Sequence, residues 1–157
     1  MGNMLEIKPI ASGQTDQFAA IWIPWLESMG RSPEPEDLAI MRDPATYYRG
    51  TGGEAFLATL DNKTVGAVAV KGLGASGCEF CKLVVTDSAR GHGAGRALVQ
   101  QCLDFCAAQG GPALYLQSFN ALDVALGLYA RMGFEHVAPP PEMAVLARTE
   151  VIMAKPV

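Results

Sequence analysis

The chain has 157 residues, half of them apolar, and its 12 Lys and Arg stand against 16 Asp and Glu, a net charge of −4. This length fits one domain over residues 1–157 with a substantial core, and the apolar content excludes an intrinsically disordered chain. The acidic balance excludes a whole-protein basic field for nucleic acid, and no apolar run approaches the roughly 20 residues of a membrane-spanning helix. Since the N-terminus also lacks a signal-peptide pattern, we expect a soluble cytoplasmic protein with neither a nucleic-acid nor a membrane partner.

The first fifty residues predict one strand and two helices. A short strand over Leu5–Ile10 precedes an amphipathic helix from Phe18, in which apolar residues recur at steps of three and four. Pro24 lies inside this helix and is expected to kink it. A second helix is predicted over Glu36–Arg42, with acidic residues in its first turn, where the helix dipole favours them.

Two strands, Glu54–Leu60 and Val65–Lys71, come next, and the polar turn Asp61–Thr64 between them is typical of an antiparallel hairpin. After a glycine-rich loop, a third apolar strand spans Glu79–Val85 and leads into a second glycine-rich turn that opens a helix.

That helix ends at Gly110–Pro112 and is followed by a strand over Ala113–Gln117. A further helix is predicted over Leu122–Met132, and two strands are predicted near Phe134–Val137 and Glu150–Ala154. A hairpin followed by strand–helix–strand units predicts an α/β (α+β mixed) fold with helices packed on a mixed sheet.

The four cysteines allow two interpretations. Cys78 and Cys81 form a C-x-x-C pair and Cys102 and Cys106 lie one helical turn apart, so one interpretation is a four-thiolate zinc site. The other is four buried thiols in a reducing compartment. Residues three apart on a strand point to opposite faces, which favours the second interpretation, and we expect no metal site.

The segment Arg90–Arg96 follows a strand, opens a helix and holds glycine at alternate positions. Backbone amides at a helix start form an anion-binding concavity, and flanking guanidinium groups add charge-assisted hydrogen bonds. The dinucleotide fingerprint fails because Arg96 stands where it needs glycine, and no Gly-Lys-Ser/Thr of a P-loop occurs. The pattern predicts a pyrophosphate site, and a turn without ligand is the alternative.

Arg90-x-x-Gly93-x-Gly95 resembles the R/Q-x-x-G-x-G/A signature of the GCN5-related N-acetyltransferase (GNAT) superfamily. Leu83-x-Val85 precedes this turn at the distance typical of that family's central strand.

Further along the chain, Asn120 and Leu128–Phe134 resemble the family's N…LY-x-x-x-GF segment, so that the similarity extends over about residues 54–153. Asp87 is a departure, because many members carry proline there.

The resemblance implies a GNAT-like three-layer fold, in which helices flank a central, mixed, mostly antiparallel and splayed sheet. Acetyl-coenzyme A would lie between the strands Glu79–Val85 and Ala113–Gln117, with its pyrophosphate on the glycine-rich turn. The resemblance assigns to this cofactor the residues Leu83, Val84, Val85, Arg90, Gly91, His92, Gly93, Ala94, Gly95, Arg96 and Asn120. His92 itself is interpreted as a solvent-side residue of the turn and not as a base.

The implied reaction is direct attack of an amine on the thioester. The family pattern makes Tyr129 the general acid for the departing thiolate, and the alternative is a core aromatic at helical spacing. Glu79 is the best-placed candidate base, acting through a water chain. Two other roles for Glu79 stay equally open: it contacts the substrate ammonium, or it is a paired charge on the strand.

The acceptor side is the least recognisable part of the sequence. Trp22 and Trp25 lie about one turn apart on the first helix, where they are either core residues or, as in proteins of this fold, part of the acceptor pocket wall. Lys82 and Arg148 interrupt apolar stretches. Surface-facing charges are the favoured interpretation of these two residues, and contacts to an acidic substrate are the alternative.

Together these features predict an N-acetyltransferase that acts on a primary amine of a small molecule or peptide. A catalytically silent acyl-coenzyme A-binding module of the same fold is the alternative, and transfer to a hydroxyl group stays open. The resemblance also implies a possible homodimer, because dimers are common for this fold.

Overall fold

The computed structural model describes residues 4–89 and 91–157, and its elements alternate along the chain. Its strands are β1 (Leu5–Pro9), β2 (Glu54–Leu60), β3 (Lys63–Gly72), β4 (Cys78–Val85), β5 (Ala113–Ser118), β6 (Glu135–His136) and β7 (Val151–Pro156). Its α-helices are α1 (Gln17–Ser28), α2 (Pro35–Met41), α3 (Pro44–Gly50), α4 (Ala94–Ala108) and α5 (Asp123–Arg131).

The predicted order of elements is confirmed, except that α3 was missed. This helix has only seven residues, too few to show a helical period in the sequence. Its start signals are nevertheless present: Asp43 at the N-cap accepts a hydrogen bond from the Thr46 backbone N–H, and Pro44 occupies the first helical position.

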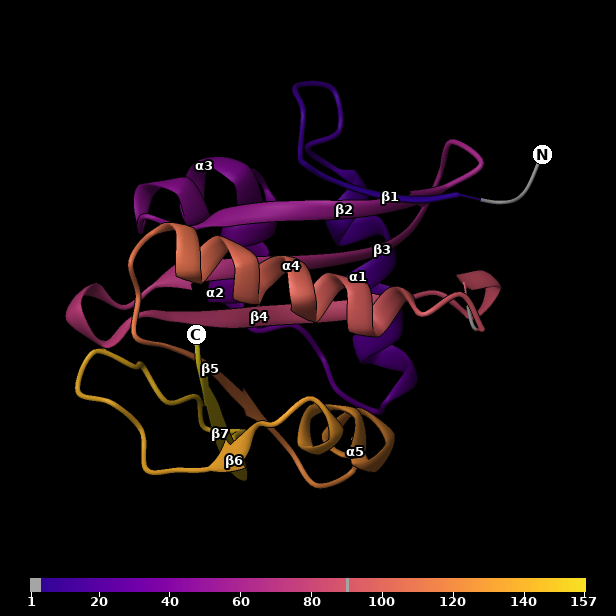
Figure 1. Cartoon of the computed structure of the whole chain (residues 1–157). Helices are drawn as coiled ribbons and strands as arrows, with labels where there is room; N and C mark the ends of the chain where they lie inside the picture. The colour runs from indigo at the N-terminus through magenta and orange to yellow at the C-terminus, as the bar shows by residue number, and fades with distance from the viewer. Residues whose placement is uncertain (1–3, 90) are drawn as a thin grey trace.

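The strands form one seven-stranded sheet in the order β1-β2-β3-β4-β5-β7-β6. Every neighbouring pair is antiparallel except β4 and β5, which are parallel. Helices flank both faces, with α4 in front of β3 and β4 in Figure 1 and α1 and α2 behind them. The predicted fold, a mixed and mostly antiparallel sheet between helices, is confirmed.

Each face of the sheet has its own hydrophobic core. On one face, Leu98 and other apolar residues of α4 and α5 pack against residues such as Phe80 of β4. On the other face, Phe18, Trp22 and Leu26 of α1 pack with residues of α2 and α3 against β2 and β3. Spaced four residues apart, these three side chains form the apolar stripe of α1, which runs on through Pro24.

The cysteines divide between these two faces, as the strand geometry predicts. Cys78, Cys102 and Cys106 are buried in the core beneath α4, whereas Cys81 lies against the opposite core. Burial and a hydrogen bond with Cys106 raise the pKa of the Cys78 thiol to about 12. Cys78 and Cys81 therefore do not share a face of β4.

The hairpin between β2 and β3 closes with a two-residue loop. Leu60 pairs with Lys63, which leaves Asp61 and Asn62 in the turn with φ values of 52° and 64°. Two consecutive positive φ angles belong to the type I′ turn, whose twist matches that of the flanking strands. Asn and Asp tolerate this left-handed region better than other side chains do.

This turn gives a stability prediction. We expect Asn62→Ala to lower the free energy of unfolding by about 1 kcal/mol, because alanine disfavours the left-handed conformation, whereas Asn62→Gly should keep or raise it. Urea unfolding of both variants measures the difference, with Lys63→Ala in the adjoining strand as the control. Equal stability of the alanine and glycine variants would contradict the turn assignment.

Candidate active site

A cavity of about 170 Å³ opens where β4 and β5 separate, and residues from both faces of the sheet line it. These two strands pair only at Cys78 with Leu114 and at Glu79 with Tyr115, and beyond Glu79 no strand of the described residues pairs with β4 on this side. The predicted splay of the sheet is confirmed, and it leaves part of the β4 backbone edge open beside the cavity.

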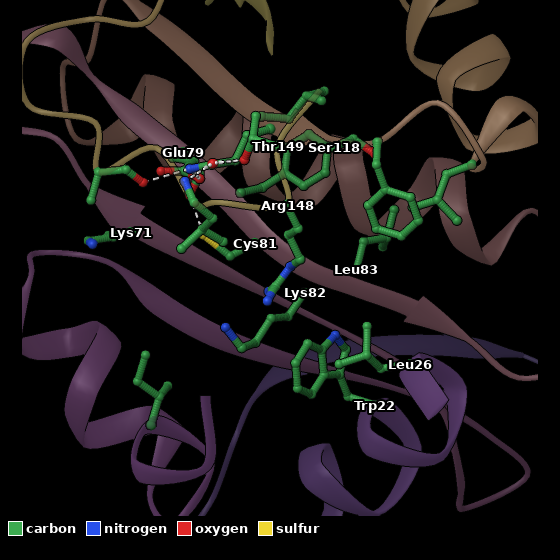
Figure 2. A pocket seen from close by; sticks show the side chains of 18 of the residues that line it. Trp22, Leu26, Lys71, Glu79, Cys81, Lys82, Leu83, Ser118, Arg148 and Thr149 are labelled. Atoms are coloured by element: carbon green, nitrogen blue, oxygen red, sulfur yellow. Dashed lines mark hydrogen bonds between the residues drawn. The ribbon is translucent and has the colours of Figure 1, made fainter. Parts of the chain in front are cut away.

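Aromatic and charged side chains dominate the cavity wall (Figure 2). The aromatic residues are Trp22, Trp25, Tyr47, Tyr48, Phe80, Phe119 and Tyr129. The charged residues are Glu36, Lys71, Glu79, Lys82 and Arg148.

A bulge in β4 determines which side chains reach this wall. Ala69 pairs with Cys81 and Ala67 with Val84, so two residues of β4 stand opposite the single residue between those partners. Lys82, the first of the two, has φ of 56°, an uncommon angle for a residue other than glycine. The extra residue reverses the alternation of faces, and Val84 therefore packs on the α1 side while Leu83 packs against the core beneath α4.

Lys82 and Arg148 converge on Asp37, a buried residue of α2. Lys82 Nζ lies 3.1 Å from Asp37 Oδ1, and Arg148 Nη1 donates to Asp37 Oδ2 over 3.3 Å. Lys82 Nζ also lies 5.0 Å from the centre of the Trp22 ring. Figure 2 shows these two side chains as neighbours. The prediction that these two charged residues face the surface was wrong, because only 9% of the Lys82 side chain and 18% of the Arg148 side chain are exposed.

The protonation of Asp37 follows from these contacts. Burial by itself raises the pKa of this carboxyl, but the Glu34 backbone N–H and the charges of Lys82 and Arg148 outweigh burial and lower the pKa below its ordinary value. Asp37 is therefore a carboxylate at neutral pH that balances one of the two cations.

Glu79 is buried, and a chain of hydrogen bonds holds its carboxylate. Gln117 Nε2 donates to Glu79 Oε2 over 2.9 Å, while Gln117 Oε1 accepts from the Thr149 hydroxyl and, over 2.9 Å, from the Leu146 backbone N–H. Lys71 stands directly across from Glu79 on β3. Burial raises the pKa of Glu79, against the lowering effect of Gln117 and the Lys71 charge.

Tyr129 belongs both to the core and to the cavity wall. Its ring makes edge-to-face contacts with Phe80 and Phe134, at centroid distances of 5.3 and 6.1 Å. Burial raises the pKa of its hydroxyl far above neutrality, which keeps the proton on the oxygen. The helical spacing that predicts a core aromatic is thus compatible with a hydroxyl beside the cavity.

The glycine-rich turn lies at the N-terminus of α4. Gly93 is the N-cap, with φ of 69°, and the backbone amides of Ala94, Gly95 and Arg96 form the first helical turn. Apart from the adjacent residues, no atom of residues 4–89 and 91–157 lies within 4 Å of the position that a Cβ would take at Gly91 or Gly93, so this part of the turn is open to an approaching group. His92 and Arg96 are exposed, and Arg90 lies outside the described residues.

The structure gathers some of the predicted site residues around the cavity and leaves others apart. Glu79, Leu83, Tyr129, Trp22 and Trp25 all line it. Val84 is buried toward α1 and Val85 is half-buried, and neither belongs to the cavity lining. Asn120 lies exposed in the loop after β5, where its backbone N–H donates to Glu150 Oε1 over 2.9 Å.

Sequence reasoning missed Asp37, Gln117 and Lys71. In the sequence, Asp37 looks like an ordinary acidic residue in the first turn of a helix. It does cap α2, because its side chain accepts a hydrogen bond from the Glu34 backbone N–H. Gln117 has no signal of its own, because its partners come from β4 and from the long segment between β6 and β7. Lys71 was expected only as the end of a strand.

Comparison with sequence families gives one match: the model of the Acetyltransferase (GNAT) family covers residues 17–134. Comparison with curated proteins finds no match.

Solved structures with the same fold come from several microbes. A GNAT-family acetyltransferase from Staphylococcus aureus shares 16% identity at a TM-score of 0.88, with 98% of this chain and 99% of that chain covered. An acetyltransferase from Streptococcus agalactiae shares 17% sequence identity at a TM-score of 0.86, with 98% of each chain covered. The PaiA N-acetyltransferase from Thermoplasma acidophilum, solved with coenzyme A, shares 14% sequence identity at a TM-score of 0.73, with 98% of this chain and 99% of that chain covered.

No helix within residues 4–89 and 91–157 combines the length and the apolar character needed to cross a bilayer.

The ion cluster around Asp37 gives a pH-dependent prediction. We expect Asp37→Asn to lower the free energy of unfolding at pH 7 by about 3 kcal/mol, because two poorly solvated cations lose their counter-charge. The pKa of Asp37 is lowered in the folded state, so its contribution is complete above about pH 4 and is lost as pH falls through the folded-state value.

Urea unfolding at pH 7, 4 and 3 measures this difference, which should narrow at the lowest pH, because the carboxyl of the unfolded chain is then largely protonated and has to lose its proton on folding. Asp16→Asn, at an exposed position whose side chain makes no capping hydrogen bond, is the control. A difference that stays the same at all three pH values would contradict the assignment.

Proposed function

The chain belongs to the Acetyltransferase (GNAT) family, and from this membership we propose that it transfers an acetyl group from acetyl-coenzyme A to a primary amine of a small molecule or peptide. The observation that carries this proposal is the cavity beside the open edge of β4, which holds a buried carboxylate, Glu79, and a protonated phenol, Tyr129. These two groups are of the kinds that an amine and a departing thiolate require.

The chain has two features that fit acetyl-coenzyme A. The first turn of α4 presents backbone amides that have no partner within the helix, beside the open positions of Gly91 and Gly93, and Arg96 belongs to the same turn, which suits a pyrophosphate. The edge of β4 from Leu83 to Val85 suits the amide groups of a pantetheine arm, and a backbone N–H near Val84 or Val85 would polarise the thioester carbonyl. The structure of the Thermoplasma relative with coenzyme A supports this use of the fold.

When bound, the thioester supplies an activated acetyl group. The amine nitrogen forms a bond to the acetyl carbon, the carbon–sulfur bond breaks, and the electron pair of that bond leaves on sulfur. Tyr129 donates a hydrogen bond, and finally a proton, to that sulfur. Burial raises the pKa of Tyr129 further above that of a thiol, so a hydrogen bond that strengthens as charge develops describes its role better than early proton transfer.

Glu79 is proposed to accept the proton of the attacking ammonium through water. A free amine has a pKa near 10.4, and deprotonation at pH 7 costs about 4–5 kcal/mol without such help. The raised pKa of Glu79 brings the carboxylate closer to neutrality and makes it a better base. Trp22 and Trp25 form the apolar wall on the acceptor side, and the four free thiols support a reducing, cytoplasmic compartment.

Asn120 is assigned a cofactor contact by the family pattern alone, since its side chain is exposed and away from the cavity lining. A silent acyl-coenzyme A-binding module is the second candidate. It differs from the enzyme in one respect, because it would bind the thioester without release of coenzyme A to any amine.

Calorimetric titration and a thiol-release assay test the proposal together. We expect acetyl-coenzyme A to bind and free thiol to appear with amines. Arg96→Gln should weaken cofactor binding about 10-fold, because one charge-assisted contact to phosphate is lost. Arg42→Gln removes an equal charge at an exposed residue just after α2 and should change nothing. Binding without thiol release from any amine would favour the silent module.

Loss of the Tyr129 hydroxyl tests its role as proton donor. Tyr129→Phe should lower kcat about 100-fold or more while cofactor affinity stays unchanged, because only the proton donor is lost.

The role of Glu79 is tested by the pH profile of the rate. Glu79→Gln should lower the rate at neutral pH but leave the rate at high pH intact, where the amine is already deprotonated. A Glu79→Gln profile identical to the wild type at every pH would remove the base role.

A further inference from the structure

We infer that the acceptor is a small amino acid: a primary amine that also carries a carboxylate, which Arg148 and Lys82 bind while the amine lies toward Glu79. This inference rests on the proposed function, because it concerns the acceptor of the same site. It follows from the charges, the spare hydrogen-bond donors, the connectivity and the size of the cavity.

Two cations of the cavity wall share a single counter-charge. Lys82 and Arg148 both line the cavity and both pair with the buried carboxylate of Asp37. Lys71 stands across from Glu79 on the neighbouring strand, and Glu36, the other acid of the lining, is exposed. The Lys82–Arg148 pair therefore keeps one positive charge that Asp37 does not balance, which favours a ligand with an anionic group over a polyamine.

Arg148 has donors to spare for that group. A guanidinium carries five N–H donors, and Asp37 is its only hydrogen-bonding partner among the residues that the structure describes. None of the described buried side-chain nitrogen or oxygen atoms lacks a partner, so the Arg148 nitrogens that do not contact Asp37 are accessible, and Arg148 is a residue of the cavity wall. A planar fork of N–H groups beside a second cation matches the two oxygens of a carboxylate.

Sequence and hydrogen bonds connect this cation to the buried carboxylate. Arg148 is followed by Thr149, whose hydroxyl donates to Gln117, and Gln117 in turn donates to Glu79. Figure 2 shows the side chain of Arg148 directed toward Lys82, and Thr149 and Glu79 joined by the dashed hydrogen bonds. Because Arg148 and Glu79 line the same small cavity, an acceptor whose ammonium faces Glu79 and whose carboxylate faces Arg148 has to be a small molecule.

The volume and the apolar wall restrict the rest of the molecule. The cavity of about 170 Å³ is smaller than the roughly 300–1,000 Å³ of pockets for drug-sized ligands. Trp22, Trp25 and Tyr47 line one side of it and suit an apolar side chain. A free amino acid with an apolar side chain meets all of these constraints, whereas a peptide would have to leave most of its length outside.

The experiment compares acceptors that differ only in the carboxylate. Leucine, leucinamide and isopentylamine form one set, phenylalanine, phenylalaninamide and 2-phenylethylamine form a second, and spermidine represents the polyamines. The thiol-release assay gives kcat/KM for each acceptor. The three amines of a set differ in intrinsic reactivity, so the decisive quantity is the acid-to-amide ratio of kcat/KM in the wild type relative to a variant.

We expect Arg148→Gln to lower this ratio about 10- to 100-fold, mainly through KM, because one charge-assisted contact to the substrate is lost. Arg148→Lys should give an intermediate ratio, since lysine keeps the positive charge but lacks the paired N–H donors of the guanidinium. Arg42→Gln should match the wild type, and all variants should bind coenzyme A with unchanged Kd.

An unchanged ratio in Arg148→Gln, or a higher kcat/KM for spermidine than for any amino acid, would overturn the inference while the proposed function stands. Thioester binding without thiol release from any acceptor would overturn both. If Arg148→Gln does not fold, competition in the wild type decides: isovalerate should inhibit the transfer at a lower concentration than isovaleramide, and equal inhibition would overturn the inference.

Discussion

The separation of β4 from β5 is the constraint on which the rest of the site depends. The two strands share only two residue pairs and then diverge, so that a backbone edge and a cavity open inside an otherwise continuous sheet. The bulge at Lys82 lies next to this point and reverses the faces of the following residues. The Lys82 side chain pairs with Asp37, which joins α2 to the centre of the sheet.

Two polar groups connect the cavity to distant parts of the chain. Asp37 joins Lys82 to Arg148 from the segment before β7, and Gln117 joins Glu79 to the same segment through Leu146 and Thr149. That segment has no helix or strand of its own, so its position depends on these contacts. The arrangement of charge in the cavity is therefore coupled to the docking of one loop.

Much of the architecture was predictable from local patterns. The stripe of Phe18, Trp22 and Leu26 indicates α1, and the opposite directions of Cys78 and Cys81 follow from strand geometry. The polar stretch Asp61–Thr64 indicates the β2–β3 turn, which the structure narrows to its first two residues. The glycine-rich turn before α4 was likewise visible. Each of these features depends on residues close together in the chain, where the spacing of side chains determines the geometry.

The sequence by itself determined the order of elements apart from α3, the family resemblance and the chemical types of Glu79 and Tyr129. Only the tertiary structure decided that Lys82 and Arg148 point inward, because their common partner Asp37 lies 111 residues from Arg148 along the chain. The same holds for Gln117, whose partners come from separate segments. The burial of a charge depends on counter-charges that the fold brings from elsewhere, and no local pattern encodes that proximity.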